Sequence, residues 1–501
     1  MYKHKKQYII HIQHLLLVLL LLLLLLSNKP HEAFTFNTYV NKYNKYNTYN
    51  KYNTYYKHTP THTPPSSLTT TATTTTTTTT TLHSAVLPNT PSTPNLPPAP
   101  SSKIGVLFLN LGGPSTSTDV EGFLYNLFAD PDIIRLPPLL SSFQKPIAAF
   151  ISMRRAPKSI KAYNSIGGGS PIVKYTEEQA ELVKAQLKER HNVEVETYVG
   201  MRYWYPFTEE ALEKINRDEV TNLVIVPLYP QFSVSTSGSS LRLLQSYLTS
   251  PTPLLPPTIK HTVIDSWYDR PGYVSSVSSL TLSSLDSLPP GPDRHVLFSA
   301  HGVPKSYIQA GDPYQSQVED CVRLIAQTLP PDVTVHLSYQ SRVGPIQWLT
   351  PYTDDVIPRL GSEGVKSLVV VPISFVSEHI ETLEEIDIEY KSLALASGVT
   401  NWRRVPALNT SPAFIADVAD MVRDALDEPA VSVTSACVRN NCVDEGETTV
   451  DDMMAINGMK DDRLGNAEKV NGRLAMLGVV GTVFWEVASG KGVFSYFFGT
   501  G

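Results

Sequence analysis

Six runs of apolar residues, arranged as two groups of three, constrain the fold of this chain more than any other feature. They occupy 104–111, 193–199 and 223–228 in the first group and 295–300, 333–338 and 367–373 in the second. Runs without polar alternation suit strands of a parallel sheet that is covered on both faces. Helical patterns such as 175–189 and 314–329 lie between the runs. The alternation predicts an α/β fold with doubly wound parallel sheets.

The two groups of runs are similar to each other in sequence. Residues 222–228 read Asn-Leu-Val-Ile-Val-Pro-Leu, and residues 367–373 read Ser-Leu-Val-Val-Val-Pro-Ile. This similarity predicts two related halves, 103–270 and 271–428, that face each other. Ligands of such sheets bind at the carboxyl ends of the strands, so we expect a cleft there.

His301 directly follows the apolar run 295–300 and precedes Gly302. A histidine at the carboxyl end of a strand faces the expected cleft, and its ordinary pKa near 6.5 suits proton transfer at neutral pH. Taken alone, a single histidine of this kind is more often structural.

A row of carboxylates follows the last apolar run. Glu381, Glu385 and Glu389 are spaced four apart, which places them on one face of a helix, and His379 stands at the start of that helix. Like charges at this spacing are mutually unfavourable, so the row suggests a use such as conducting protons or hard cations. The alternative is a solvated acidic helix face.

Several function classes are excluded by composition and motif. The net charge of −6 does not favour nucleic acid as a partner. The three cysteines cannot supply four thiolates to an iron–sulfur cluster. Paired-cysteine zinc patterns are absent, and Gly167–Ser170 belongs to neither a P-loop nor a dinucleotide fingerprint.

The first hundred residues have the features of a targeting sequence. A basic start precedes an apolar run at 15–26, and Ala33 is a suitable cleavage residue, which is typical of a signal peptide over 1–33. Residues 34–102 are rich in Asn, Tyr, Thr and Pro and cannot bury enough apolar surface to fold. A signal followed by such a transit-like segment predicts import into a plastid enclosed by the secretory system. The alternative is a secreted protein with a Thr-rich linker.

The C-terminal residues form a second module. Residues 429–463 are polar and acidic and are predicted to be a linker. Residues 464–490 are largely apolar, and a helix of that length is long enough to cross a bilayer. Residues 491–501 form a short tail. The module predicts a membrane anchor.

The middle of the chain, over 103–427, resembles the ferrochelatase family. Eight segments in the order of the family carry the resemblance: Leu109-Asn-Leu-Gly-Gly-Pro114, Arg154-Arg-Ala-Pro-Lys158, Tyr163-Asn-Ser-Ile-Gly-Gly-Gly-Ser-Pro171, Gly200-Met-Arg-Tyr203, Tyr229-Pro-Gln-Phe-Ser233, Phe298-Ser-Ala-His-Gly302, Gln340-Ser-Arg-Val-Gly-Pro345 and Val376-Ser-Glu-His-Ile-Glu-Thr382. The resemblance implies an ATP-independent enzyme that inserts Fe²⁺ into protoporphyrin IX to make haem.

The resemblance also implies roles for single residues. His301 and Glu381 would handle the metal and the pyrrole protons from opposite faces of the macrocycle, with the division between them left open. His379 would be a second histidine of the site, and Glu385 and Glu389 would lead away from Glu381. The residues implied to hold the porphyrin are Arg154, Arg155, Tyr163, Ser170, Arg202, Tyr203 and Trp348.

Two departures from the family pattern bear on cofactor and substrate. Val234 stands where members with a [2Fe–2S] cluster have a core cysteine, so no cluster is expected and no cofactor is required beyond substrate Fe²⁺. Ile134 stands where some bacterial members have a tyrosine, which favours the protoporphyrin-using branch over the coproporphyrin-using one.

The predicted C-terminal helix resembles the chlorophyll a/b-binding motif of light-harvesting proteins. Glu468, Asn471 and Arg473 are among its matching residues. The resemblance implies that Glu468 pairs with Arg473 of a partner helix and that chlorophyll binds there. An intramembrane charge needs a partner, so it also implies a homodimer or pairing with another single-helix protein at the thylakoid membrane. The alternative is a plain anchor.

Two other functions compete with iron insertion. One is a chelatase of the same two-half fold that acts on a sirohydrochlorin-type ring, and such enzymes usually lack the segment from Ser377 to Thr382. The other is a carrier of porphyrin or chlorophyll that regulates light-harvesting assemblies without catalysis. A carrier would need neither His301 nor Glu381. Magnesium insertion is disfavoured because that reaction is driven by ATP and no P-loop is present.

Overall fold

The computed structural model describes residues 102–440, apart from 137, 290, 292–293, 343–345 and 429. The described residues up to Ala436 form one compact unit, and a second unit begins at Cys437. The predicted signal peptide 1–33, nearly all of the segment 34–102, most of the linker 429–463 and the whole C-terminal helix and tail lie outside the described residues. Among the residues that are described, no helix is both long and apolar enough to cross a membrane.

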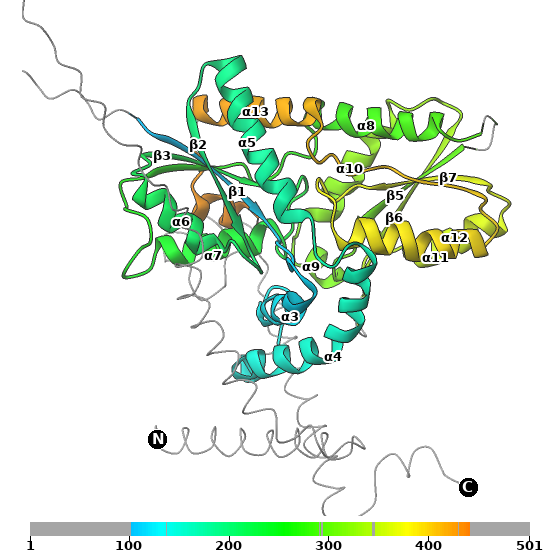
Figure 1. Cartoon of the computed structure of the whole chain (residues 1–501), viewed down its shortest axis with the longest axis horizontal. Helices are drawn as coiled ribbons and strands as arrows, with labels where there is room; N and C mark the ends of the chain where they lie inside the picture. The colour runs from blue at the N-terminus through cyan, green and yellow to red at the C-terminus, as the bar shows by residue number, and fades with distance from the viewer. Residues whose placement is uncertain are drawn as a thin grey trace, which may run out of the picture. The chain divides into compact units, whose positions relative to one another are not determined.

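Two parallel sheets of four strands each form the centre of the unit (Figure 1). The first has the order β2-β1-β3-β4 and the second the order β6-β5-β7-β8. The strands are β1 Ile104–Asn110, β2 Val195–Met201, β3 Asn222–Pro227, β4 Lys260–Val263, β5 Arg294–His301, β6 Val333–Gln340, β7 Ser367–Pro372 and β8 Asn401–Arg404. The second sheet thus repeats the strand order of the first, as two related halves require.

All six predicted strands are confirmed, with no end shifted by more than two residues. The prediction missed β4 and β8. Both have four residues, lie at the edge of a sheet and are only partly buried. An edge strand packs on fewer neighbours, so its sequence carries no continuous apolar run that could reveal it.

Helices connect and cover the strands. Their bounds are α3 Val120–Ala129, α4 Gln144–Ser165, α5 Ile172–His191, α6 Thr208–Arg217, α7 Ser237–Leu248, α8 Pro271–Asp286, α9 Lys305–Gln309, α10 Tyr314–Ala326, α11 Thr353–Ser362, α12 Lys391–Ala396, α13 Pro412–Asp427 and α14 Val433–Arg439. Short 3₁₀ segments lie at η1 Ser117–Asp119 and η2 Pro138–Phe143, and η3 Glu381–Tyr390 is a π-helix. The predicted helices 175–189 and 314–329 are confirmed as α5 and α10.

One hydrophobic core joins the two halves. Val106 and Phe108 of β1 belong to the same cluster of buried side chains as Val296 and Phe298 of β5. Helix α13, although it ends the second half, packs on both α5 and α8 (Figure 1). Its Phe414 stacks on the Trp267 ring with centroids 6.0 Å apart. The halves are therefore held together by apolar packing as well as by polar contacts.

Phe414→Ala should lower the urea concentration at half-unfolding, by an amount equivalent to about 3–5 kcal/mol, because it removes a fully buried ring from this shared core. Leu395→Ala on α12 is the matched control, since half of that side chain is exposed. Equal midpoints for the two variants would contradict a core shared by both halves.

Candidate active site

The carboxyl ends of β5, β6 and β7 bring three distant segments to one edge of the second sheet. His301, the last residue of β5, is in register with Gln340, the last residue of β6. β7 ends at Pro372, after which the chain passes Ser374 and reaches Glu381 at the start of η3. Parallel strands end at a common edge, so these residues meet although up to 80 positions separate them.

His301 and Glu381 are in direct contact. The imidazole Nδ1 lies 2.8 Å from Glu381 Oε2, within hydrogen-bonding distance. The main chain of His301 is also fixed, because its N–H donates to Ser374 Oγ and its carbonyl accepts from Tyr314 Oη. The His301 side chain remains 35% exposed. The imidazole is thus held in one orientation and is still accessible to a substrate.

Burial and pairing act in opposite directions on this pair. Burial by itself would lower the pKa of His301, but the charge and hydrogen bond of Glu381 outweigh it and raise that pKa above its ordinary value. Burial would likewise raise the pKa of Glu381, and the His301 charge and hydrogen bond outweigh it and lower that pKa. The protein therefore favours an imidazolium paired with a carboxylate.

The contact between His301 and Glu381 bears on the expectation that the two groups flank opposite faces of the macrocycle. At 2.8 Å, His301 Nδ1 and Glu381 Oε2 leave no room for a ring between them in this structure. How the two groups lie around a bound ring stays a prediction.

Glu385 continues the line from Glu381 through shared hydrogen-bond donors. Ser341 Oγ lies 2.7 Å from Glu385 Oε2 and 3.2 Å from Glu381 Oε2, and Gln340 Nε2 lies 3.3 Å from both oxygens. Tyr390 Oη donates to the other oxygen of Glu385 at 2.7 Å. Burial, followed by the Glu381 charge, raises the pKa of Glu385 to about 7. Glu385 can therefore gain and lose a proton near neutral pH.

The helix that carries these carboxylates is a π-helix over its ten residues, whereas the spacing argument assumed an α-helix. π-helices are rare, usually last a single turn and often occur at functional sites. Glu381 and Glu385 share donors, as expected for one face. Glu389 is exposed on the same helix, and its charge acts on Glu384.

His379 is almost fully buried, and burial lowers its pKa, so the ring is neutral at neutral pH. Its ring lies against Phe375, with centroids 4.3 Å apart, and Phe375 in turn lies 6.2 Å from the His301 ring. Its Nδ1 is buried without a hydrogen-bond partner among the described residues. A buried polar atom usually has a hydrogen-bond partner, so a bound water or substrate would supply one for this nitrogen.

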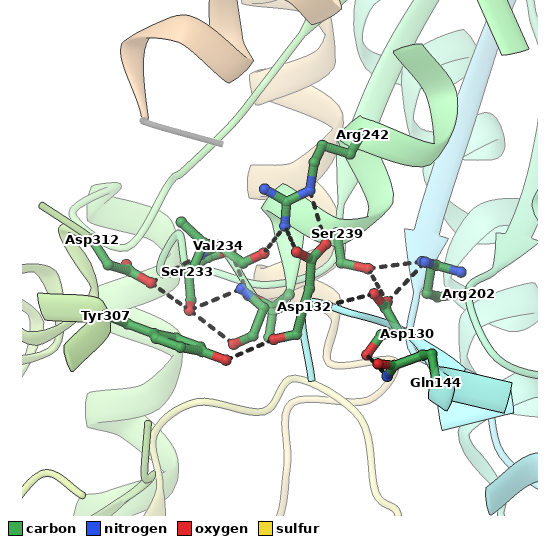
Figure 2. A network of polar contacts seen from close by, with 12 residues as sticks. Asp130, Asp132, Gln144, Arg202, Ser233, Val234, Ser239, Arg242, Tyr307 and Asp312 are labelled. Atoms are coloured by element: carbon green, nitrogen blue, oxygen red, sulfur yellow. Dashed lines mark hydrogen bonds and ion pairs between the residues drawn. The ribbon is translucent and has the colours of Figure 1, made fainter. Parts of the chain in front are cut away.

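Arg202 and Tyr203, expected in the porphyrin pocket, both bind a buried carboxylate in the first half. Figure 2 shows Arg202 and Ser239 converging on Asp130, whose Oδ2 accepts from Arg202 Nη2 at 2.8 Å and from Ser239 Oγ at 2.6 Å. Tyr203 Oη donates to the same oxygen at 2.6 Å. Burial places the pKa of Tyr203 well above its ordinary value. In this structure both side chains hold the end of α3 in place.

The other expected porphyrin contacts fall in three places. Tyr163 is buried, and burial followed by the charge of Glu381 raises the pKa of its hydroxyl. Arg154 and Arg155 are exposed on α4. Ser170 lies in the glycine-rich turn, where its N–H donates to the Pro114 carbonyl at 2.8 Å.

Trp348, the remaining expected porphyrin contact, lies beside Gly302, the residue after His301. It forms an isolated antiparallel bridge with Pro304, and a Cβ added to Gly302 would come within 3.4 Å of the indole ring. The Trp348 side chain is partly exposed.

Sequence analysis did not assign a role to Gln340, Ser341 or Tyr390. Gln340 and Ser341 stand in one of the segments that carried the family resemblance, and Ser341 adopts a φ of 65°, which is unusual outside glycine. Tyr390 could not be found from α-helical spacing, because residues five apart are about 140° apart around an α-helix.

No group of three or more His, Cys, Asp or Glu side chains in the described part of the chain is arranged to hold a metal ion.

Glu381→Gln should lower the pKa of His301, because it removes the negative charge that raises this pKa and leaves the burial that lowers it. An NMR titration of the imidazole in the protein without metal measures the change. Glu389→Gln is the control on the same helix and should leave the titration as in the wild type. An unchanged His301 titration in Glu381→Gln would show that the contact does not set this pKa.

Comparison with known proteins identifies the relatives of this chain. The family model described as ferrochelatase matches residues 103–426. A relative named "Ferrochelatase-2, chloroplastic" from Arabidopsis thaliana is 51% identical over 408 residues, which cover 78% of this chain and 79% of the relative. A relative named "Ferrochelatase" from Nostoc punctiforme is 51% identical over 399 residues, covering 78% of this chain and 97% of the relative.

Among solved structures, the cobalt complex of a sirohydrochlorin chelatase from Bacillus subtilis matches with a TM-score of 0.38 at 11% identity, over 65% of this chain and 97% of that one. A likeness this weak does not bear on function. The family model spans more than half of the chain and the curated relatives share half of the aligned residues, so the chain belongs to the ferrochelatase family.

Proposed function

We propose that the chain inserts Fe²⁺ into protoporphyrin IX to form protohaem, without ATP, as the last step of haem biosynthesis. As a ferrochelatase-family member the chain is a metal chelatase. The observation that carries the finer proposal is the contact of His301 with Glu381 at an accessible strand end, next to a second carboxylate whose pKa is near neutral. Metal insertion into a porphyrin needs acceptors for two pyrrole protons and an oxygen or nitrogen ligand for the metal, and this cluster offers both.

The proposed route for protons starts at the His301–Glu381 pair. The imidazolium of His301 first gives up its proton through Glu381, and Ser341 Oγ, which contacts both carboxylates, can pass it to Glu385. The imidazole, now neutral, then accepts a pyrrole proton. Glu385 releases its proton readily near pH 7. Glu389, exposed further along the helix, would complete the route to solvent. His379 would assist from the other side of Phe375.

The porphyrin would lie over this edge of the second sheet, with Trp348 and Tyr163 close to its centre. The exposed guanidinium groups of Arg154 and Arg155 on α4 suit its two propionates, since guanidinium and carboxylate groups pair in a bidentate manner. Ser170 would contact the rim. Arg202 and Tyr203 would support the wall through Asp130 rather than bind the ring themselves.

The proposed reaction requires no cofactor beyond substrate iron. Cys321 is the one described cysteine in the catalytic halves, and it is fully buried. Burial raises the pKa of its thiol to about 12, so it is a poor source of the thiolate that a [2Fe–2S] cluster needs.

Anaerobic incubation of the purified full chain in detergent with protoporphyrin IX and Fe²⁺, without ATP, should convert the free-porphyrin absorption spectrum to that of haem. His301→Ala and Glu381→Gln should each lower turnover by at least about 100-fold, because the acceptor pair is broken. Porphyrin binding, followed by fluorescence quenching, should persist in both variants. Tight binding without turnover in the wild-type chain would favour a non-catalytic carrier instead.

We also propose that the chain works in a plastid, anchored to the thylakoid membrane by the helix at 464–490. Relatives named chloroplastic support the plastid. The match to the Nostoc punctiforme relative covers 78% of this chain, more than the residues 103–426 of the family model, so the likeness extends beyond the catalytic halves. Glu468, Asn471 and Arg473 would bind chlorophyll where two copies, or this helix and another single-helix protein, pair.

Removal of residues 464–501 should move the protein from the membrane fraction to the supernatant of an alkaline wash, because the proposed anchor is lost while α14 is kept. Glu468→Gln with Arg473→Gln in the full chain should keep the protein in the membrane but lower the chlorophyll that copurifies with it. Retention of chlorophyll in that double variant would leave a plain anchor as the function of the helix.

A further inference from the structure

A single buried guanidinium connects the edge of the second sheet to two points on the segment that carries the carboxylates. Arg404, the last residue of β8, has a side chain only 10% exposed. Its Nη1 lies 2.8 and 3.1 Å from the two carboxylate oxygens of Glu378, and its Nε donates to Asp387 Oδ2 at 2.7 Å. Glu378 precedes η3, and Asp387 lies within it.

The contact of Arg404 with Glu378 continues through hydrogen bonds to the turn at His379. Glu378 is buried, and besides Arg404 its carboxylate accepts the Ala407 N–H at 3.1 Å and the hydroxyl of Thr382. Thr382 Oγ1 in turn accepts the N–H of His379 at 3.1 Å. Arg404, Glu378, Thr382 and His379 are thus linked in series by hydrogen bonds. The position of Arg404 therefore fixes the turn in which His379 and Glu381 stand.

The ion pair between Arg404 and Asp387 holds the middle of the π-helix. The bond from Tyr390 to Glu385 joins residues five apart, which fits the i to i+5 repeat of a π-helix. In an α-helix these two residues would be about 140° apart and could not meet. A π-helix of this length is intrinsically unfavourable, so tertiary contacts must hold it, and the Arg404–Asp387 ion pair is placed to do so.

Resting on the proposed function, we infer that Arg404 is a positioning residue of the metal-insertion site. By holding Glu378 and Asp387 together it maintains the helix register in which Glu381 and Glu385 share Ser341 and Gln340 as donors. Buried ion pairs seldom add net stability and are better suited to selecting one arrangement over its alternatives. The Asp387 side chain is itself 36% exposed, so its loss is expected to change stability little.

Asp387→Asn in the full chain tests the inference without leaving a buried charge unpaired, because Arg404 keeps Glu378. We expect kcat for iron insertion to fall roughly tenfold, from misplacement of Glu385, with KM for porphyrin and the unfolding midpoint unchanged. Asp387→Glu should restore part of kcat. Asp320→Asn, which removes an exposed aspartate paired with Arg323, is the matched control and should behave as the wild type.

A mutant cycle with Glu385→Gln shows whether the effect acts through Glu385. Asp387→Asn should cost much less than tenfold in the Glu385→Gln background. An equal cost in both backgrounds, or a wild-type kcat in Asp387→Asn, would overturn the inference.

Hydrogen exchange of the amides of 381–390 provides a test that needs no turnover. Asp387→Asn should accelerate exchange there by about tenfold or more and leave the strands unchanged, because the anchor of the helix is lost. Unchanged exchange would also overturn the inference. The wild-type chain could show no turnover while hydrogen exchange in Asp387→Asn rose as expected. The proposed function would then fail, and the inference that Arg404 and Asp387 hold the π-helix would stand.

Discussion

The parallel pairing of β5 with β6 and β7 is the constraint on which the site depends. His301 and Gln340 are in register at the ends of β5 and β6, and β7 delivers the chain to Glu381 at the same edge. Antiparallel neighbours would send these ends to opposite edges of the sheet. The cluster forms because parallel strands have their carboxyl ends at the same edge of the sheet. The core that is shared with the first sheet keeps this edge in place.

Glu381 and Glu385 share hydrogen-bond donors but differ in their other partners. Two carboxylates compete for the hydroxyl of Ser341 and the amide of Gln340, and only Glu381 also has the imidazole of His301. The His301 charge and hydrogen bond outweigh burial at Glu381 and keep it ionised, whereas burial and the Glu381 charge raise the pKa of Glu385 to about 7. Two like groups whose environments drive their pKa values apart are characteristic of sites that move protons. The π-helix makes this arrangement possible, because it brings Tyr390 to Glu385.

The first half holds two of the expected pocket residues in a polar network. Arg202 and Tyr203 are bound to Asp130, and the neighbouring Asp132 accepts from Arg242, while its carbonyl accepts from Tyr307 of the second half (Figure 2). A resemblance identifies residues that a family uses, but it does not say whether a residue touches the ligand or supports one that does. That distinction depends on which partners the chain places within hydrogen-bonding distance.

The sequence by itself determined the α/β class, six of the eight strands, the two-half organisation and the family. Buried strands appear in it as apolar runs, and the family motifs appear as short segments of fixed residue types. It also singled out His301, His379, Glu381 and Glu385 as candidates. The tertiary structure alone decided that His301 and Glu381 are in contact, that the acidic helix is a π-helix, and that Ser341, Tyr390 and Arg404 belong to the arrangement. These are matters of distance between residues far apart in the chain or of helix register, and neither leaves a pattern in a single sequence.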